Sequence, residues 1–158
     1  MEKFSIIKLS VSLLFTVGLG ALSSVFVAPE IDTWYAALNK PSFNPPNNIF
    51  APVWTALYIF MGISLYLIWN KPVSQVRTAG VLFFLMQFML NIVWSVLFFA
   101  LHKIGGAFIE IVFMWLFILF TINEFRKLNK VAAWLLVPYI LWVSFAAVLN
   151  FAIWKLNS

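Results

Sequence analysis

Residues 34 to 69 read WYAALNKPSFNPPNNIFAPVWTALYIFMGISLYLIW, and this stretch decides the fold. It opens on an aromatic pair, Trp34 and Tyr35, and continues into a short polar segment with three prolines, Pro41, Pro45 and Pro46. A long apolar run follows, with Pro52 near its start, where the missing backbone N–H of a proline costs a helix little. The pattern predicts a stiff loop followed by a membrane-spanning helix.

The loop of residues 34–46, called the lid below, is expected to cover something. In lipid, a non-helical backbone must be covered by protein or water, so a free loop is disfavoured. Behind the lid, Trp54, Tyr58 and Met61 occur at i, i+4 and i+7, which places them on one helical face. A rigid aromatic face beneath a proline-braced loop indicates a pocket.

The composition of the whole chain is that of an integral membrane protein. Hydrophobic residues make up 64% and charged residues 9%, against roughly 45–50% and about 25% in a typical globular chain. The 158 residues contain no hydrophilic block long enough for a second unit, so we expect a single transmembrane domain over 1–158. The chain has no cysteine and one histidine, which excludes thiolate and His-rich metal centres.

Five segments have the length of about 20 mostly apolar residues that a spanning helix needs. They run over residues 5–28, 48–69, 79–101, 105–124 and 131–154. These runs are too long for barrel strands, so an all-α bundle of five transmembrane helices is predicted. The first run exceeds a signal-peptide core and is interpreted as a retained helix, in which Gly18 and Gly20 permit close approach of a neighbour.

Five spans place the termini on opposite sides, and the basic residues are unequally divided between those sides. Lys3, Lys8, Lys71, Arg77, Arg126, Lys127 and Lys130 fall on the N-terminal side, and Lys40, Lys103 and Lys155 on the other. The positive-inside rule therefore predicts a cytoplasmic N-terminus in a bacterial cell membrane, with the lid facing outward. This topology explains the net charge of +5 better than a nucleic-acid patch does.

Polar residues in the third segment permit two interpretations. Gln87, Asn91 and Ser95 recur at i, i+4 and i+8 and line one face, which Trp94 flanks. Such a face can be an interhelical hydrogen-bond ladder that holds the bundle together without a ligand. It can equally present an amide to a ligand in a cavity, and the spacing does not separate the two.

The fourth and fifth segments carry further features. Pro138 is expected to kink the fifth helix. Trp142 and Ala146 share a face beyond it, and an indole one turn from a small residue fits a flat ligand or plain core packing. Glu110 lies about a turn and a half into the fourth segment, close enough to its start to reach headgroup water, and is interpreted as structural.

These residues together resemble the TspO/MBR family, the tryptophan-rich sensory and translocator proteins, or peripheral-type benzodiazepine receptors. The matching elements are WYAALNKPSFNPP, APVWTALY, LN--WS-LFF and PYILW--FAAVLNF-IW, in family order over residues 15–157. One departure is Phe43, where many members have tryptophan, so an aromatic ring is kept and the indole N–H is lost.

The resemblance implies a five-helix bundle whose first loop caps a ligand cavity. Carried over by position, the family's pocket residues are Tyr35, Trp54, Asn91, Trp142 and Ala146; the spacing adds Tyr58 and Trp94. The implied ligands are porphyrins and related tetrapyrroles, sterols, and isoquinoline carboxamides or benzodiazepines, with no cofactor. The family's sterol motif is incomplete, because Phe151 replaces its tyrosine, which disfavours dedicated cholesterol transport.

Two classes of function follow from the resemblance. The first is a sensory or translocator-type protein that binds tetrapyrroles and moves or regulates them. The second is enzyme-like, since some bacterial members are associated with light- and oxygen-dependent degradation of bound protoporphyrin IX, attributed to tryptophans that correspond to Trp54 and Trp142. Indoles also simply stack on flat rings, so binding is preferred to catalysis. Whether the protein forms a homodimer is left open.

Overall fold

The computed structural model describes residues 4–158, so Lys3, counted above among the basic residues, lies outside the described residues. The helices are α1 (Ile6–Ile31), α2 (Trp34–Ala37), α3 (Asn47–Trp69), α4 (Gln75–Ser95), the π-helical turn η1 (Val96–Ala100), α5 (Ile104–Leu128), α6 (Lys130–Leu135) and α7 (Val137–Leu156). Five helical stretches of the described chain are long and apolar enough to cross a membrane, α4 running on into η1 and α6 into α7. The predicted all-α, five-span fold is confirmed.

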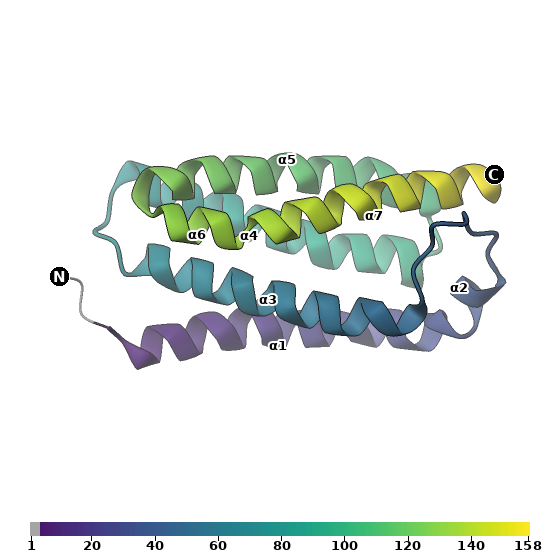
Figure 1. Ribbon diagram of the computed structural model, residues 1–158, viewed down its shortest axis with the longest axis horizontal. Helices are drawn as coiled ribbons and strands as arrows, with labels where there is room; N and C mark the ends of the chain where they lie inside the picture. Colours follow the sequence, from purple (N-terminus) through teal and green to yellow (C-terminus); the bar gives the residue numbers. More distant parts are fainter. Residues whose placement is uncertain (1–3) are drawn as a thin grey trace.

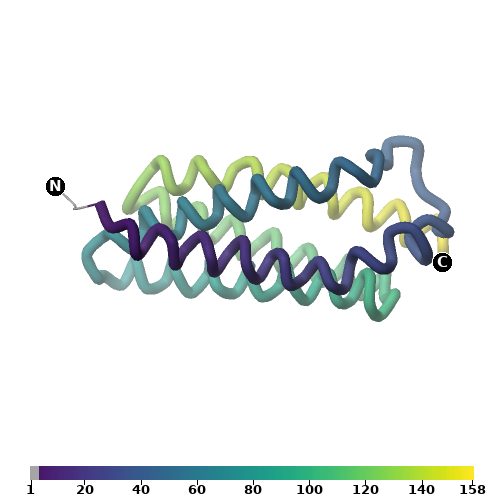
Figure 2. Tube along the Cα trace, turned by 90° about the horizontal axis from the view of Figure 1, so that it is seen from below, coloured from purple at the N-terminus to yellow at the C-terminus, as the bar shows by residue number. Residues whose placement is uncertain are grey.

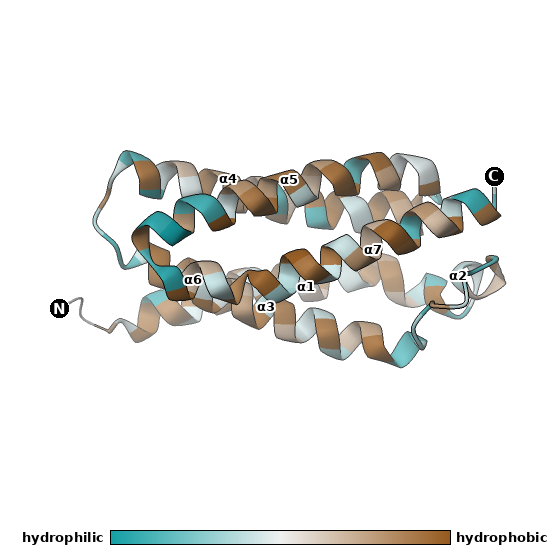
Figure 3. Ribbon diagram, turned by 45° about the horizontal axis from the view of Figure 1, so that its top comes forward, coloured by the Kyte–Doolittle hydropathy of each residue, from teal (hydrophilic) through white to brown (hydrophobic). Residues whose placement is uncertain are grey.

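The bundle is elongated, with all five spans along its long axis (Figure 1). The start of α1 and the α3–α4 connection lie at one end, and the lid, whose first residues form α2, lies with the C-terminus at the other, as Figure 2 shows from a second direction. Hydrophobic residues cover the length of the helices, and hydrophilic ones gather towards the two ends (Figure 3). This distribution is that of a multi-pass membrane protein.

Aromatic stacking and one close helix approach build the core. Phe84 stacks on Phe88 and on Phe125, with ring centroids 6.2 and 6.0 Å apart, and all three are buried. On the other side of the bundle, α1 and α3 meet at Gly62, where a Cβ would lie 2.6 Å from Thr16 Oγ1. The pair α1–α3 therefore packs backbone against side chain, which small residues permit inside a membrane.

The predicted kink at Pro138 is confirmed as a break between α6 and α7. Leu136 turns the chain: its N–H donates to Ala133 O over 3.1 Å, and Pro138 occupies the first turn of α7. Proline is tolerated at that position because the N–H it lacks would have no helical partner. As a result α3 packs on α6 rather than along α7, and room remains between α3 and α7 towards the α2 end.

Three expectations from the sequence were wrong in detail. The first helix does not stop before Pro29 but runs on to Ile31, because proline in the last turn disturbs few remaining backbone bonds. The fourth span continues past Glu124 to Leu128. Glu110 does not reach headgroup water: it is buried, and both of its carboxylate oxygens are buried with no hydrogen-bond partner among the described residues.

Candidate functional site

A cavity of about 540 Å³ lies between α1, α3, the end of α4 with η1, and α7. It occupies the half of the bundle next to α2. Its walls are largely apolar, and Asp32 carries the one formal charge among the described residues that line it. Six of the seven residues expected from the sequence line this cavity: Tyr35, Trp54, Tyr58, Trp94, Trp142 and Ala146.

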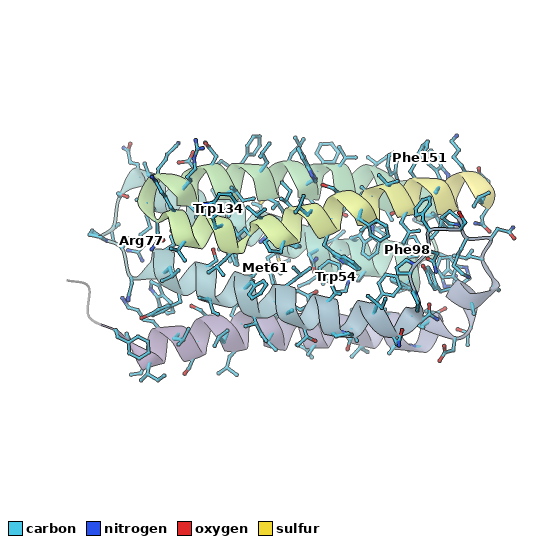
Figure 4. All side chains as sticks on the ribbon, in the orientation of Figure 1. Trp54, Met61, Arg77, Phe98, Trp134 and Phe151 are labelled. Atoms are coloured by element: carbon cyan, nitrogen blue, oxygen red, sulfur yellow. The ribbon has the colours of Figure 1, made fainter. Side chains whose placement is uncertain are left out.

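Flat aromatic rings form two of its walls. On α3, the Trp54 ring stacks on Tyr58 with centroids 5.6 Å apart and planes at 28°, and Figure 4 shows Trp54 between the α3 ribbon and α7. On α7, Trp142 meets Phe50 of α3 edge-on at 6.2 Å. The indole nitrogens of Trp54 and Trp142 have no hydrogen-bond partner in the described chain. Both N–H groups therefore remain free to donate.

Trp94 is held differently from the other two indoles. Its Nε1 donates to Asn150 Oδ1 over 3.0 Å, and Asn150 Nδ2 donates to Ile104 O over 2.9 Å. The indole therefore links α4, α7 and the start of α5, and its N–H is already used. Its wide face, which stacks on Phe98 at 5.2 Å, is what it contributes to the wall.

The π-helical turn η1 supplies a wall that the sequence did not reveal. Leu101 N donates to Val96 O over 2.9 Å, five residues back, which widens the turn. Two consecutive residues, Phe98 and Phe99, are both buried and both line the cavity. Single π-helical turns inside α-helices are frequent at functional sites, because they redirect side chains that a regular turn would separate.

Asn91, the seventh expected residue, lies behind the cavity wall instead of lining it. It accepts a hydrogen bond from the Tyr58 hydroxyl over 2.8 Å, and its amide nitrogen lies 3.4 Å from the Tyr139 hydroxyl. Tyr139 in turn donates to Gln87 Oε1 over 2.7 Å. Gln87 and Asn91 thus form the interhelical ladder of the first interpretation, joining α3, α4 and α7 beneath the aromatic wall.

The lid is tied to itself and to the end of α7. Lys40 Nζ donates to the carbonyl oxygens of Tyr35, Ala36 and Leu38 at 2.7, 3.0 and 3.0 Å. Asn39 exchanges two hydrogen bonds with the side chain of Asn157, at 3.0 and 2.9 Å. Of the lid residues, Tyr35 lines the cavity, and the three lid prolines do not.

Tyr35 connects the lid to the cavity. Its hydroxyl donates to Asn44 Oδ1 over 2.7 Å, across the turn that Pro41, Pro45 and Pro46 stiffen. Burial in this apolar setting raises the pKa of Tyr35 to about 12, so the phenol stays neutral and can keep donating.

The neighbouring Trp34 stacks on His102 at 4.1 Å, and His102 Nε2 lies 3.2 Å from Glu30, which joins α1 to the η1–α5 connection.

Comparison with known proteins places this architecture in a family. The model of the TspO/MBR family matches residues 11–155. The chain belongs to the TspO/MBR family. The tryptophan-rich protein TspO of Chlorobaculum tepidum is 40% identical over 156 residues, covering 96% of this chain and 97% of that protein. The protein of the same name from Archaeoglobus fulgidus is 39% identical over 154 residues, 98% and 99% of the two chains.

The similarity extends to animal members of the TspO/MBR family. The translocator protein of Ovis aries is 36% identical over 140 residues, which covers 87% of this chain and 83% of that protein. The family resemblance inferred from the quoted motifs is confirmed, and with it a TspO-type membrane protein.

Sequence reasoning missed most of the α1 wall of this TspO/MBR cavity. Helix α1 contributes small residues to the wall, namely Gly20, Ala21, Ser24 and Ala28, of which Gly20 makes room for the Tyr58 ring. The signal was present as a run of small residues on one face. The sequence could not show that these residues line a cavity, because a face of small residues also permits tight packing between helices. Gly62 on α3 is an example of such packing.

Proposed function

We propose that the protein binds a flat, largely apolar tetrapyrrole in the cavity between α1, α3, η1 and α7, in a sensory or translocator role. The observation that carries the proposal is the convergence of Trp54 and Trp142, from two different helices, on one cavity. The volume of about 540 Å³ lies within the range of about 300–1,000 Å³ typical of ligand pockets.

The cavity also offers the polar contacts that such a ligand needs. Tetrapyrroles carry carboxylates on a flat conjugated ring, and the free indole N–H groups of Trp54 and Trp142 are donors set in an apolar wall. Among the relatives, the names tryptophan-rich sensory protein and translocator protein describe sensing and translocation.

The test is titration of the purified protein with protoporphyrin IX, followed by quenching of tryptophan fluorescence. Trp142→Ala should weaken binding by on the order of 1–2 kcal/mol, roughly 5- to 30-fold in Kd, because a stacked ring is lost. The matched control is Trp134→Ala on α6, since Trp134 is 70% exposed and does not line the cavity. Equal loss in both variants, or loss in neither, would place the ligand elsewhere.

A second candidate function rests on the same two indoles. Trp54 and Trp142 line one cavity and are both free of hydrogen-bond partners in the described chain, which suits oxidation of a bound porphyrin by molecular oxygen under light. Illumination of the complex in air, followed by absorption spectroscopy, tests it. A new product that disappears in Trp54→Phe and Trp142→Phe would favour this function, and bleaching that is identical in the variants would reject it.

A further inference from the structure

A second hollow lies at the opposite end of the bundle from the tetrapyrrole cavity. This groove has a volume of about 230 Å³ and is bounded by α1, α3 and α4. Its wall is defined here by Ser12, Phe15, Leu65, Trp69, Val81 and Leu85. Leu85 is 39% exposed on the outer, lipid-facing side of α4, so the groove is accessible from the bilayer.

One buried polar atom beside this apolar wall has no hydrogen-bond partner in the described chain. Ser12 is 1% exposed, and its Oγ has no hydrogen-bond partner in the described chain. Serine and threonine inside membrane helices usually donate to the carbonyl four residues back, as Thr16 does to Ser12 O at 3.1 Å. Ser12 makes no such bond and its Oγ is covered in this structure, so the hydroxyl would reach a partner in the groove by rotating about the Cα–Cβ bond.

A cationic group stands at the end of the groove nearest the N-terminus. Lys8 lies one turn before Ser12 on the same face of α1. Its Nζ lies 5.9 Å from the Trp69 ring centroid and donates to Asn70 Oδ1 over 3.2 Å. Arg77, at the start of α4, lies at this same end of the molecule (Figure 4). The groove thus has a basic side chain at one end and an apolar surface along its length, with the Ser12 hydroxyl buried directly beside it.

We propose that this groove binds an anionic phospholipid. The phosphate would pair with Lys8, and one acyl chain would lie against Phe15, Leu65 and Val81. A glycerol-ester carbonyl would accept from Ser12 Oγ once that hydroxyl has rotated into the groove. Lys8 and Ser12 are four residues apart, about 6 Å along the helix, a spacing that suits the phosphate and ester of one lipid molecule. Basic pockets between transmembrane helices are known to hold anionic head groups.

Native mass spectrometry of the full-length protein, titrated with phosphatidylglycerol or phosphatidylcholine, tests the head-group contact. Lys8→Gln should weaken phosphatidylglycerol binding about fivefold, the effect of one basic side chain near an anionic surface, and leave phosphatidylcholine binding unchanged. The matched control is Lys155→Gln, since Lys155 Nζ also lies over an indole, 4.9 Å from the Trp154 centroid, but at the other end of the bundle. If Lys8→Gln and Lys155→Gln weakened phosphatidylglycerol binding equally, the effect would come from the net charge of the protein and not from a contact with Lys8. That result would overturn the proposal.

Filling the groove tests the acyl-chain contact. Val81→Phe should lower the occupancy of the tightest lipid for both head groups, whereas Val148→Phe, on the exposed face of α7, should not. Protoporphyrin IX affinity should not change in Val81→Phe, because Val81 does not line the tetrapyrrole cavity. Unchanged lipid occupancy in Val81→Phe would overturn the proposal. Lys8→Gln, which adds no bulk to the groove, keeps the test decisive if the bulky variant does not fold.

Discussion

At the scale of single residues, the position of the Trp54 ring depends on a glycine in another helix. A Cβ at Gly20 would collide with the ring of Tyr58, on which Trp54 stacks. The absence of a side chain on α1 therefore sets the aromatic wall of α3. Gly18, two residues earlier, has nothing within 4 Å of its Cβ position.

We predict that Gly20→Ala displaces Tyr58 and Trp54, at the cost of about 1–3 kcal/mol that overpacking usually carries. Protoporphyrin IX affinity and the melting temperature should both fall. Gly18→Ala should leave both close to those of the parent protein. If the two alanine variants behave alike, the aromatic wall is adaptable and Gly20 does not set it.

Glu110 is a second residue whose surroundings predict an outcome. Its carboxyl is buried in α5 without a hydrogen-bond partner in the described chain, an arrangement that disfavours the folded state. Glu110→Met, of similar size and apolar, is expected to raise the free energy of unfolding by about 1–3 kcal/mol. Glu124→Met, which removes the 2.6 Å pair with Lys127, should bring no gain. Destabilisation by Glu110→Met would mean that the carboxyl has a partner in the membrane.

The position of Asn91 behind the cavity wall shows what residue spacing can and cannot predict. The period of Gln87, Asn91 and Ser95 places them on one buried face, and all three are buried. What the amide binds depends on Tyr58 and Tyr139, which arrive from α3 and α7, 33 and 48 residues away in sequence. No local pattern contains that information, so the two interpretations could be separated only by the tertiary structure.

At the scale of elements, Pro45 and Pro46 stiffen the part of the lid that leads into α3, while Trp34, Tyr35 and Asn39 hold the lid to the rest of the bundle. Its prolines restrict the unfolded chain, which lowers the entropy lost on ordering. We predict that replacing both Pro45 and Pro46 with glycine speeds protoporphyrin IX dissociation and leaves the melting temperature nearly unchanged. Pro72→Gly, in the α3–α4 connection at the opposite end, is the control.

Hydrogen exchange provides the independent measurement on the lid. Bound porphyrin should slow exchange over residues 34–46 more than over residues 70–74. Equal protection of the two loops would mean that the prolines only end one helix and begin the next.

The helix boundaries predicted from the sequence agree with the structure where hydropathy determines them. They differ from the structure where backbone hydrogen bonds determine them. The five spans were predictable because apolar runs of that length have few other uses. The extension of α1 through Pro29 and the widened turn η1 could not be predicted from hydropathy. Each depends on which backbone carbonyl accepts the hydrogen bond of a given N–H group. The break at Leu136 was predictable because Pro138 removes a donor.

At the scale of the whole molecule, the two ends of the bundle carry unequal charge. Six basic residues of the described chain lie at the N-terminal end, namely Lys8, Lys71, Arg77, Arg126, Lys127 and Lys130. Lys40, Lys103 and Lys155 lie at the lid end. The positive-inside rule thus predicts that the lid faces away from the cytoplasm.

The absence of cysteine makes this orientation directly measurable. Ser42→Cys in the lid and Val73→Cys in the α3–α4 connection place single thiols at exposed positions on opposite ends. In intact bacterial cells, a membrane-impermeant maleimide should label the first variant and reach the second only after permeabilisation. The reverse pattern would invert the topology.

The separation of α3 from α7 bears on how a ligand arrives. Helices α1 and α3 pack together, α5 packs against both α4 and α7, and the two groups meet at α6, at η1 and along α4. The cavity lies between them, where the Phe50–Trp142 ring contact spans from α3 to α7. A movement of α3 away from α7 at the α2 end, with the α3–α6 contact kept, would open the cavity sideways towards the lipid. A hydrophobic guest would then enter from the bilayer instead of from water, at a rate that falls as the surrounding lipid is made stiffer.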